Sequence, residues 1–316
     1  MKSTRAHKKI ILTIIIVFIS FGAIILLILS NFSFVFSFFQ PKDKTTEQTE
    51  TWQSIWNKDT SRIEKFNIPF GQSSRRVEVY LPKDYDTNIQ TTYPTLYLLH
   101  GKGGDETDWL NKGEVQKTLD EAIDNNIIEP LVVVLPDGNG SKNHHTQYIN
   151  AADGSELNED LIYKDLVELI TKKYRTKNDS KFRAIGGNSA GGFGSLNIGL
   201  KHQDVFGEVM SFSGYGHLLT YSSPSLIQNS KEVIDNNSPL TYISKLKTKN
   251  LKIWLTIGSD DSSAFIEDNY KLKKSLDRVD INNQLTVTSG AHDWNFWKSH
   301  LGDGLSWLGL QWRDRG

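Results

Sequence analysis

The sequence predicts an α/β fold whose central sheet is mostly parallel, with helices on both faces, preceded by one N-terminal transmembrane helix. Short apolar runs alternate with amphipathic segments, several of these runs end in glycine-rich turns, and one long uncharged apolar run lies near the start. The chain has 316 residues, of which 38% are hydrophobic, enough for a sizeable core. Composition therefore excludes wholesale disorder.

The long apolar run, residues 10–29, reads IILTIIIVFISFGAIILLIL. As a helix it would span about 30 Å, the thickness of a bilayer core. Basic residues precede it within the first nine positions, and no charge follows before Lys42. This asymmetry predicts a cytoplasmic N-terminus, a single-pass anchor in the cell membrane and an extracellular location for the rest of the chain. A cleaved signal peptide and a buried core helix are the alternatives.

Four segments are expected along the chain. Residues 1–9 form a basic cytoplasmic segment, residues 10–30 the signal anchor, residues 31–62 a polar linker or stalk, and residues 63–316 one globular domain. The linker is rich in Thr, Glu and Lys, which is typical of a solvated segment.

Strand-like and helix-like segments alternate in the globular part. Arg75–Leu81 alternates polar and apolar residues, which is typical of a half-exposed strand, whereas Leu131–Leu135 is continuously apolar, which is typical of a strand buried on both faces. Strands are expected at Arg75–Leu81, Tyr93–His100, Leu131–Leu135, Phe182–Ile185, Val209–Phe212, Lys252–Ile257 and Gln284–Thr288. Helices are expected at Glu114–Asn126, Asn158–Tyr174, Phe193–Leu200 and Ile266–Leu276, and Tyr215–Asn250 is expected to be a lid insertion.

The run Gly187-Asn188-Ser189-Ala190-Gly191 matches G-x-S-x-G and lies between a predicted strand and a predicted helix. That is the context of a nucleophile elbow, in which side chains at the glycine positions would clash with the neighbouring strand and helix. Ser189 is therefore the candidate nucleophile. A glycine-rich structural turn is the alternative.

A serine nucleophile needs a base and an acid that orients the base. Gly258-Ser259-Asp260-Asp261 follows one predicted strand, and His292 follows the last one. Their order, serine then acid then histidine, is that of the α/β-hydrolases. The turn after Tyr93–His100 can supply a second backbone donor for an oxyanion, so the N–H groups of Lys102 and Ala190 are the expected pair.

Several classes of function are excluded or disfavoured. The chain has no cysteine, which removes disulfides, thiolate nucleophiles and Cys-ligated metals. The net charge of −1 shows no excess of basic residues of the kind that binds nucleic acid. Phosphate-loop patterns are absent, and no cofactor or metal is implied.

The runs LYLLHGKGGDETDWLNKG, LVVVLPDGN, GGNSAGGFGSLNIGL, GSDD and GAHDWNFWKSHL together resemble the esterase D-like "putative esterase" family of α/β-hydrolases, and bacterial feruloyl esterase domains most of all. The resemblance covers roughly residues 66–301. It implies that Ser189 is the nucleophile, His292 the base and Asp261, the last residue of G-x-x-D, the acid. Asn188 and Ala190 stand where feruloyl esterases usually carry Leu and Met.

These observations predict a membrane-anchored extracellular serine esterase that cleaves carboxylic esters, with acyl groups on carbohydrates or related molecules as substrates. Trp109, Asn188 and Trp294 are candidates for the substrate pocket. Trp297 is expected to pack beneath it. An acyltransferase with the same triad and a non-catalytic binding module are the alternatives.

Overall fold

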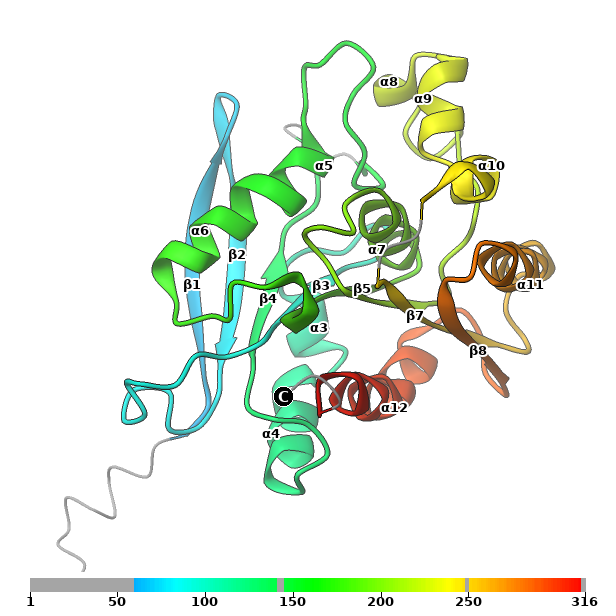
Figure 1. The fold of residues 1–316 in the computed structure, drawn as a ribbon. Helices are drawn as coiled ribbons and strands as arrows, with labels where there is room; N and C mark the ends of the chain where they lie inside the picture. Colours follow the sequence, from blue (N-terminus) through cyan, green and yellow to red (C-terminus); the bar gives the residue numbers. More distant parts are fainter. Residues whose placement is uncertain (1–59, 141–144, 248–249, 314–316) are drawn as a thin grey trace, which may run out of the picture. The chain divides into compact units, whose positions relative to one another are not determined.

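A twisted sheet with the strand order β1-β2-β4-β3-β5-β6-β7-β8 forms the centre of the described domain (Figure 1). The computed structural model describes residues 60–140, 145–247 and 250–313. The chain divides into two units, residues 1–58 and 59–316, and every described residue belongs to the second. The strands are β1 Arg62–Phe70, β2 Ser73–Leu81, β3 Thr95–Leu99, β4 Val132–Pro136, β5 Arg183–Asn188, β6 Glu208–Phe212, β7 Lys252–Gly258 and β8 Asn282–Thr288.

The sheet is antiparallel at one edge and parallel elsewhere. β1 and β2 form a hairpin, and β2 pairs antiparallel with β4, with Val77 opposite Pro136. All pairings from β4 to β8 are parallel. The carboxyl ends of β3, β5, β7 and β8 therefore meet at one edge of the sheet, where ligands bind in open α/β folds.

Helices cover both faces of the sheet (Figure 1). Alternate residues of each central strand enter opposite cores. Tyr97 packs in the core under α6, α7 and α11, whereas Leu96 packs in the core under α3, α4 and α12. Each fully buried side chain of this size contributes about 1.5–3 kcal/mol. The helices are α3 Asp108–Asn111, α4 Val115–Asp124, α5 Asn158–Asp160, a π-helical turn Leu161–Leu166, α6 Val167–Lys173, α7 Ala190–Lys201, α8 Pro224–Ile227, α9 Lys231–Asn236, α10 Pro239–Tyr242, α11 Ser263–Arg278 and α12 Trp294–Arg313, with 3-10 turns at Ser180–Phe182 and Ile243–Lys245.

The expected α/β fold is confirmed, and all seven expected strands occur with small shifts at their ends. The sequence patterns did not predict β1 or α12. The expected helix at Asn158–Tyr174 is broken into α5, a π-helical turn and α6. The expected lid insertion contains α8, α9 and α10.

The predicted membrane span, residues 10–30, and most of the predicted linker lie outside the described residues. Among the helices of the described part of the chain, none is long and apolar enough to cross a bilayer.

Candidate active site

The loop after β5 holds Ser189 in a conformation that few residues adopt. Its φ is 54° and its ψ is −114°, at the junction between β5 and α7. The Ser189 N–H donates to the carbonyl of Phe212 in β6 over 2.8 Å, which fixes the turn against the sheet. Positive φ in a non-glycine residue costs free energy, and strained serines of this kind present their Oγ at the top of the sheet.

The two glycines of the G-x-S-x-G run are required by close backbone contacts. A Cβ on Gly187 would lie 2.6 Å from the carbonyl oxygen of Leu99, and a Cβ on Gly191 would lie 2.4 Å from the same oxygen. The clash that the sequence pattern predicted is therefore present, and it involves the end of β3 as well as α7. Strand β3, the elbow and α7 pack together only because these side chains are missing.

Gly191→Ala is expected to lower the free energy of unfolding by about 1–3 kcal/mol, because backbone must move to admit the methyl group. Urea unfolding measures this change. Gly302→Ala is the matched control, since a Cβ at Gly302 in α12 meets nothing within 4 Å. There the change should stabilise the helix by about 0.5–1 kcal/mol. Equal stabilities for the two variants would contradict the packing argument.

Three side chains from three loops form one hydrogen-bonded line. The Nε2 of His292 lies 2.7 Å from Ser189 Oγ. The Nδ1 of His292 lies 2.9 and 3.0 Å from the two carboxylate oxygens of Asp261. A carboxylate only accepts, so Nδ1 carries the proton and Nε2 accepts from the serine hydroxyl. The structure thus brings together the residues predicted as nucleophile, base and acid.

Of the two adjacent aspartates after β7, only Asp261 reaches the histidine. The Asp261 side chain is fully buried, whereas Asp260 is exposed. The backbone N–H of Asp260 donates to the carbonyl of Gly290, which joins the acid loop to the histidine loop. A Cβ on Gly258 would lie 2.1 Å from that same carbonyl oxygen, so glycine at this position lets the two loops approach.

The predicted oxyanion donors, Lys102 and Ala190, line the same pocket as Ser189 and His292. Ala190 is the first residue of α7, and the first N–H groups of a helix have no partner within it. No hydrogen bond among the described residues uses the backbone N–H of Lys102. Both groups are therefore available to a ligand, and the α7 N-terminus adds a favourable dipole for negative charge.

The pocket above Ser189 has a volume of 520 Å³, within the range of small-molecule sites. Asn188 and Trp294 line it, as expected. Trp109 does not: it is 1% exposed, its Nε1–H donates to the carbonyl of Leu99, and its ring packs edge-on beneath Trp294. The prediction of Trp109 as a pocket residue is therefore wrong, because its indole packs in the core beneath the site.

Pattern reasoning missed much of the pocket wall. The lid insertion supplies Tyr215, Leu219 and Tyr221, and α11 supplies Phe265. The position of the insertion after β6 was the only signal for the first three residues, and Phe265 lies one residue before the expected helix Ile266–Leu276. His145 also lines the pocket. Among residues 60–140, 145–247 and 250–313, no cluster of three or more His, Cys, Asp or Glu side chains could hold a metal.

Aromatic rings hold the imidazole of His292 on two sides. Trp297 meets it edge-on at 5.1 Å between ring centroids, and Phe265 lies at 5.5 Å. Trp297 is 6% exposed and packs in the core as expected, but it also lines the pocket next to His292. These contacts limit rotation of the ring, so the Ser189 contact does not depend on a single hydrogen bond.

The parallel sheet, the strained elbow after β5, and the order of Ser189, Asp261 and His292 along the chain define the α/β-hydrolase class. A family model described as "Putative esterase" matches residues 71–308. The chain belongs to this family and is a carboxylic ester hydrolase. The resemblance identified from the sequence motifs is confirmed.

Individual relatives agree with this assignment. An acetyl esterase from Caldicellulosiruptor saccharolyticus is 24% identical over 248 residues, covering 72% of this chain and 86% of that protein. An endo-1,4-beta-xylanase/feruloyl esterase from Xylanibacter ruminicola is 31% identical over 157 residues, 49% of this chain but only 20% of that longer protein. A solved ferulic acid esterase superposes with a TM-score of 0.72 at 25% identity, covering 80% of this chain and 99% of that one.

Proposed function

We propose that the protein is a serine esterase that works through an acyl-enzyme on Ser189, with His292 as base and Asp261 as the acid that orients it. The observation that carries this proposal is the line of hydrogen bonds from Asp261 through His292 to Ser189 Oγ. A structural turn or a binding module has no need of these contacts.

In acylation, Nε2 of His292 takes the Ser189 hydroxyl proton as Oγ attacks the ester carbonyl carbon. The carbonyl oxygen becomes negative and is held by the backbone N–H groups of Lys102 and Ala190. His292 then gives the proton to the leaving alcohol. The buried carboxylate of Asp261 stabilises the transient imidazolium without taking the proton itself.

In deacylation, a water molecule takes the place of the alcohol. His292 accepts a proton from this water as the water oxygen attacks the acyl carbon. The tetrahedral intermediate again places its negative oxygen at the two backbone donors, and its collapse returns the proton to Ser189 Oγ. The products are a carboxylic acid and free enzyme.

We propose acyl groups on carbohydrates or related molecules as substrates. The names of the relatives, an acetyl esterase and feruloyl esterases, support this class. The pocket supports it as well, because aromatic rings of Tyr215, Tyr221 and Phe265 line the space next to Ser189. Such rings can pack against a sugar or an aromatic acyl group.

A substrate panel tests this function. Residues 41–316 would be assayed with p-nitrophenyl acyl esters, feruloyl esters and acetylated xylan, with Ser189→Ala as the control for background hydrolysis. Turnover of at least one ester class that disappears in the control supports the proposal. Equal rates for the protein and the Ser189→Ala control on every ester would overturn it.

We also propose that residues 10–30 anchor the enzyme in the cell membrane with the catalytic domain outside. The length of the apolar run and the basic residues before it support this topology. Full-length protein should then stay in the membrane fraction through a high-salt wash. Protease added to intact cells should release an active fragment of roughly residues 41–316. A mature N-terminus near residues 30–40 in the medium would show cleavage and secretion instead.

A further inference from the structure

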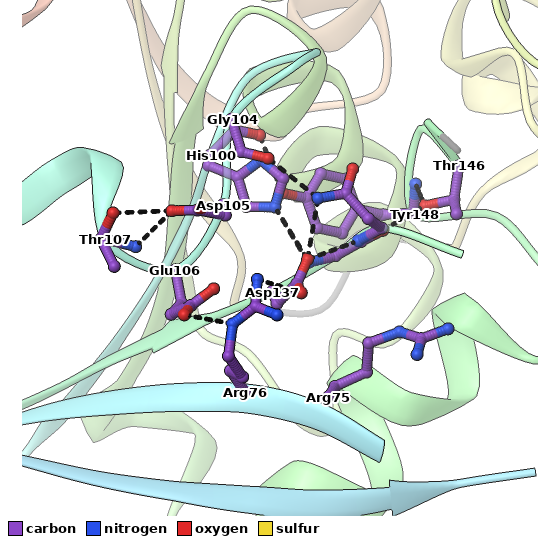
Figure 2. Close-up of polar contacts among 12 residues, drawn as sticks. Arg75, Arg76, His100, Gly104, Asp105, Glu106, Thr107, Asp137, Thr146 and Tyr148 are labelled. Atoms are coloured by element: carbon purple, nitrogen blue, oxygen red, sulfur yellow. Dashed lines mark hydrogen bonds and ion pairs between the residues drawn. The ribbon is translucent and has the colours of Figure 1, made fainter. Parts of the chain in front are cut away.

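The turn after β3 is tied to the turn after β4 through the imidazole of His100. Figure 2 shows this ring next to Asp137 of the second turn. The His100 Nδ1–H donates to the carbonyl of Gly101 over 2.8 Å. Its Nε2 accepts from the backbone N–H of Gly138 over 2.9 Å. A nitrogen that accepts carries no proton, so the two bonds together define one neutral tautomer.

Burial keeps this imidazole neutral. His100 is 2% exposed, and removal from water lowers its pKa, although the hydrogen bond to Gly101 and the nearby carboxylates, chiefly that of Asp137, act in the opposite direction. The distance from Nε2 to the nearer oxygen of Asp137 is 3.9 Å, which is too long for a hydrogen bond. Gly138 is therefore the partner that fixes Nε2.

We propose that His100 is a positioning residue for the oxyanion site, an inference that rests on the esterase function proposed above. The carbonyl of Gly101 and the N–H of Lys102 belong to one peptide group and point in opposite directions, because that peptide is trans. A bond that pulls the carbonyl toward His100 therefore turns the N–H away from His100. Lys102 lines the pocket and His100 does not, so the N–H is directed to the side where the ester binds.

The turn needs such a restraint because of its own composition. Gly101, Gly103 and Gly104 surround Lys102, and glycine-rich backbone has many accessible conformations. Gly103 adopts a φ of +77°. One internal bond, from the N–H of Gly104 to the carbonyl of Gly101 at 3.1 Å, closes the turn. The His100 bond to the same carbonyl sets the direction of the peptide plane.

A second tie holds the far end of the turn to the same loop after β4. The Nδ2 of Asn139 donates to the carbonyl of Gly104 over 2.9 Å and to Asp137 Oδ1 over 2.8 Å. Asp137 is 4% exposed, and its other oxygen pairs with Arg76 at 3.1 Å (Figure 2). The Tyr148 hydroxyl donates to the carbonyl of His100. The loop after β4 thus holds both ends of the oxyanion turn.

Two substitutions at His100 separate its two bonds. Asparagine can place an amide N–H near the position of Nδ1 and so keep the bond to Gly101. Glutamine can place an amide oxygen near the position of Nε2 and so keep the bond from Gly138, but it leaves the Gly101 carbonyl without its donor. The proposal requires the donor to Gly101, so the two variants should behave differently.

In full-length purified protein assayed with p-nitrophenyl acetate, His100→Gln should lower kcat about 10- to 100-fold with little change in KM, since an oxyanion donor acts in the transition state. His100→Asn should lower kcat by no more than about threefold. Hydrogen exchange of the 100–104 backbone should be faster in the Gln variant than in the Asn variant. Unfolding in urea shows whether the two variants differ in stability.

Equal losses of kcat in the two variants, losses that follow stability alone, or a rise in KM instead of a fall in kcat would overturn the inference. Wild-type protein and Ser189→Ala are run alongside. Failure of the wild-type protein to hydrolyse any ester would refute the proposed function, and the exchange comparison would then decide the role of His100 by itself.

Discussion

Ser189→Ala is expected to lower kcat by roughly 10⁴- to 10⁶-fold, because it removes the proposed nucleophile while leaving the pocket in place. The Ser189 hydroxyl lies 2.7 Å from Nε2 of His292, and the elbow holds it at the carboxyl end of the central strand β5. Alanine has no atom that can attack the carbonyl. Some rate above that in water should remain from the oxyanion donors and from binding.

Steady-state kinetics and labelling by a fluorophosphonate probe measure this effect together. Labelling should vanish in the variant, and its unfolding transition should stay close to that of the wild-type protein. Ser213→Ala serves as the control, because this buried serine follows β6 and does not line the pocket. Labelling that persists at another serine would remove Ser189 from the mechanism.

Asp261→Asn should lower kcat about 10⁴-fold, the cost seen when an amide replaces the acid of such a triad. The amide can donate to Nδ1 of His292, which favours the tautomer with its proton on Nε2. That tautomer cannot accept the Ser189 proton. The Asp261 side chain is fully buried, so water cannot take over its role.

The neighbouring Asp260→Asn is the matched control. Its side chain is exposed, and only its backbone N–H takes part in the loop, by donating to Gly290. We expect a loss of less than about tenfold in kcat, in line with substitutions at exposed positions. A larger loss at Asp260 than at Asp261 would show that the proposed acid is one residue out of place.

The sequence predicted the central strands and the three site residues because both leave strong local signals. Runs such as Leu131–Leu135 are continuously apolar, since both faces of the strand are buried. Ser189 and Asp261 each follow a buried strand, and His292 follows the partly exposed strand β8, all within short motifs whose order along the chain is informative. The contact between Ser189 and His292, 103 positions apart, then follows from parallel strands that end at one edge of the sheet.

The elements that the sequence did not predict have weak local signals. β1 is an edge strand with one largely exposed face, so its apolar pattern is diluted. α12 contains Gly302, Gly304 and Gly309, which lower helix propensity. It forms because its apolar stripe, which includes Leu301, packs against the sheet, and because Asp293 caps its first turn by accepting from the N–H of Phe296.

The pocket wall and the support of the oxyanion turn depend on tertiary structure alone. Tyr215, Tyr221 and Phe265 reach Ser189 only after the lid insertion and α11 have packed. His100 and Gly138 were visible as parts of two glycine-rich turns after strands. Their hydrogen bond depends on the parallel pairing of β3 with β4, which no local pattern encodes.

His292, the proposed base, follows the edge strand β8, and an edge strand has fewer neighbours than a central strand. Among the strands of the described residues, β8, which leads to His292, pairs with β7 alone and is partly exposed along its length, whereas β5, which leads to Ser189, is buried between two strands. Local opening starts where few neighbours hold a strand. Mild denaturation would therefore displace the base while the nucleophile stays in place. Activity would then decline before the global unfolding transition, and the protein could recover it by re-forming one edge of the sheet.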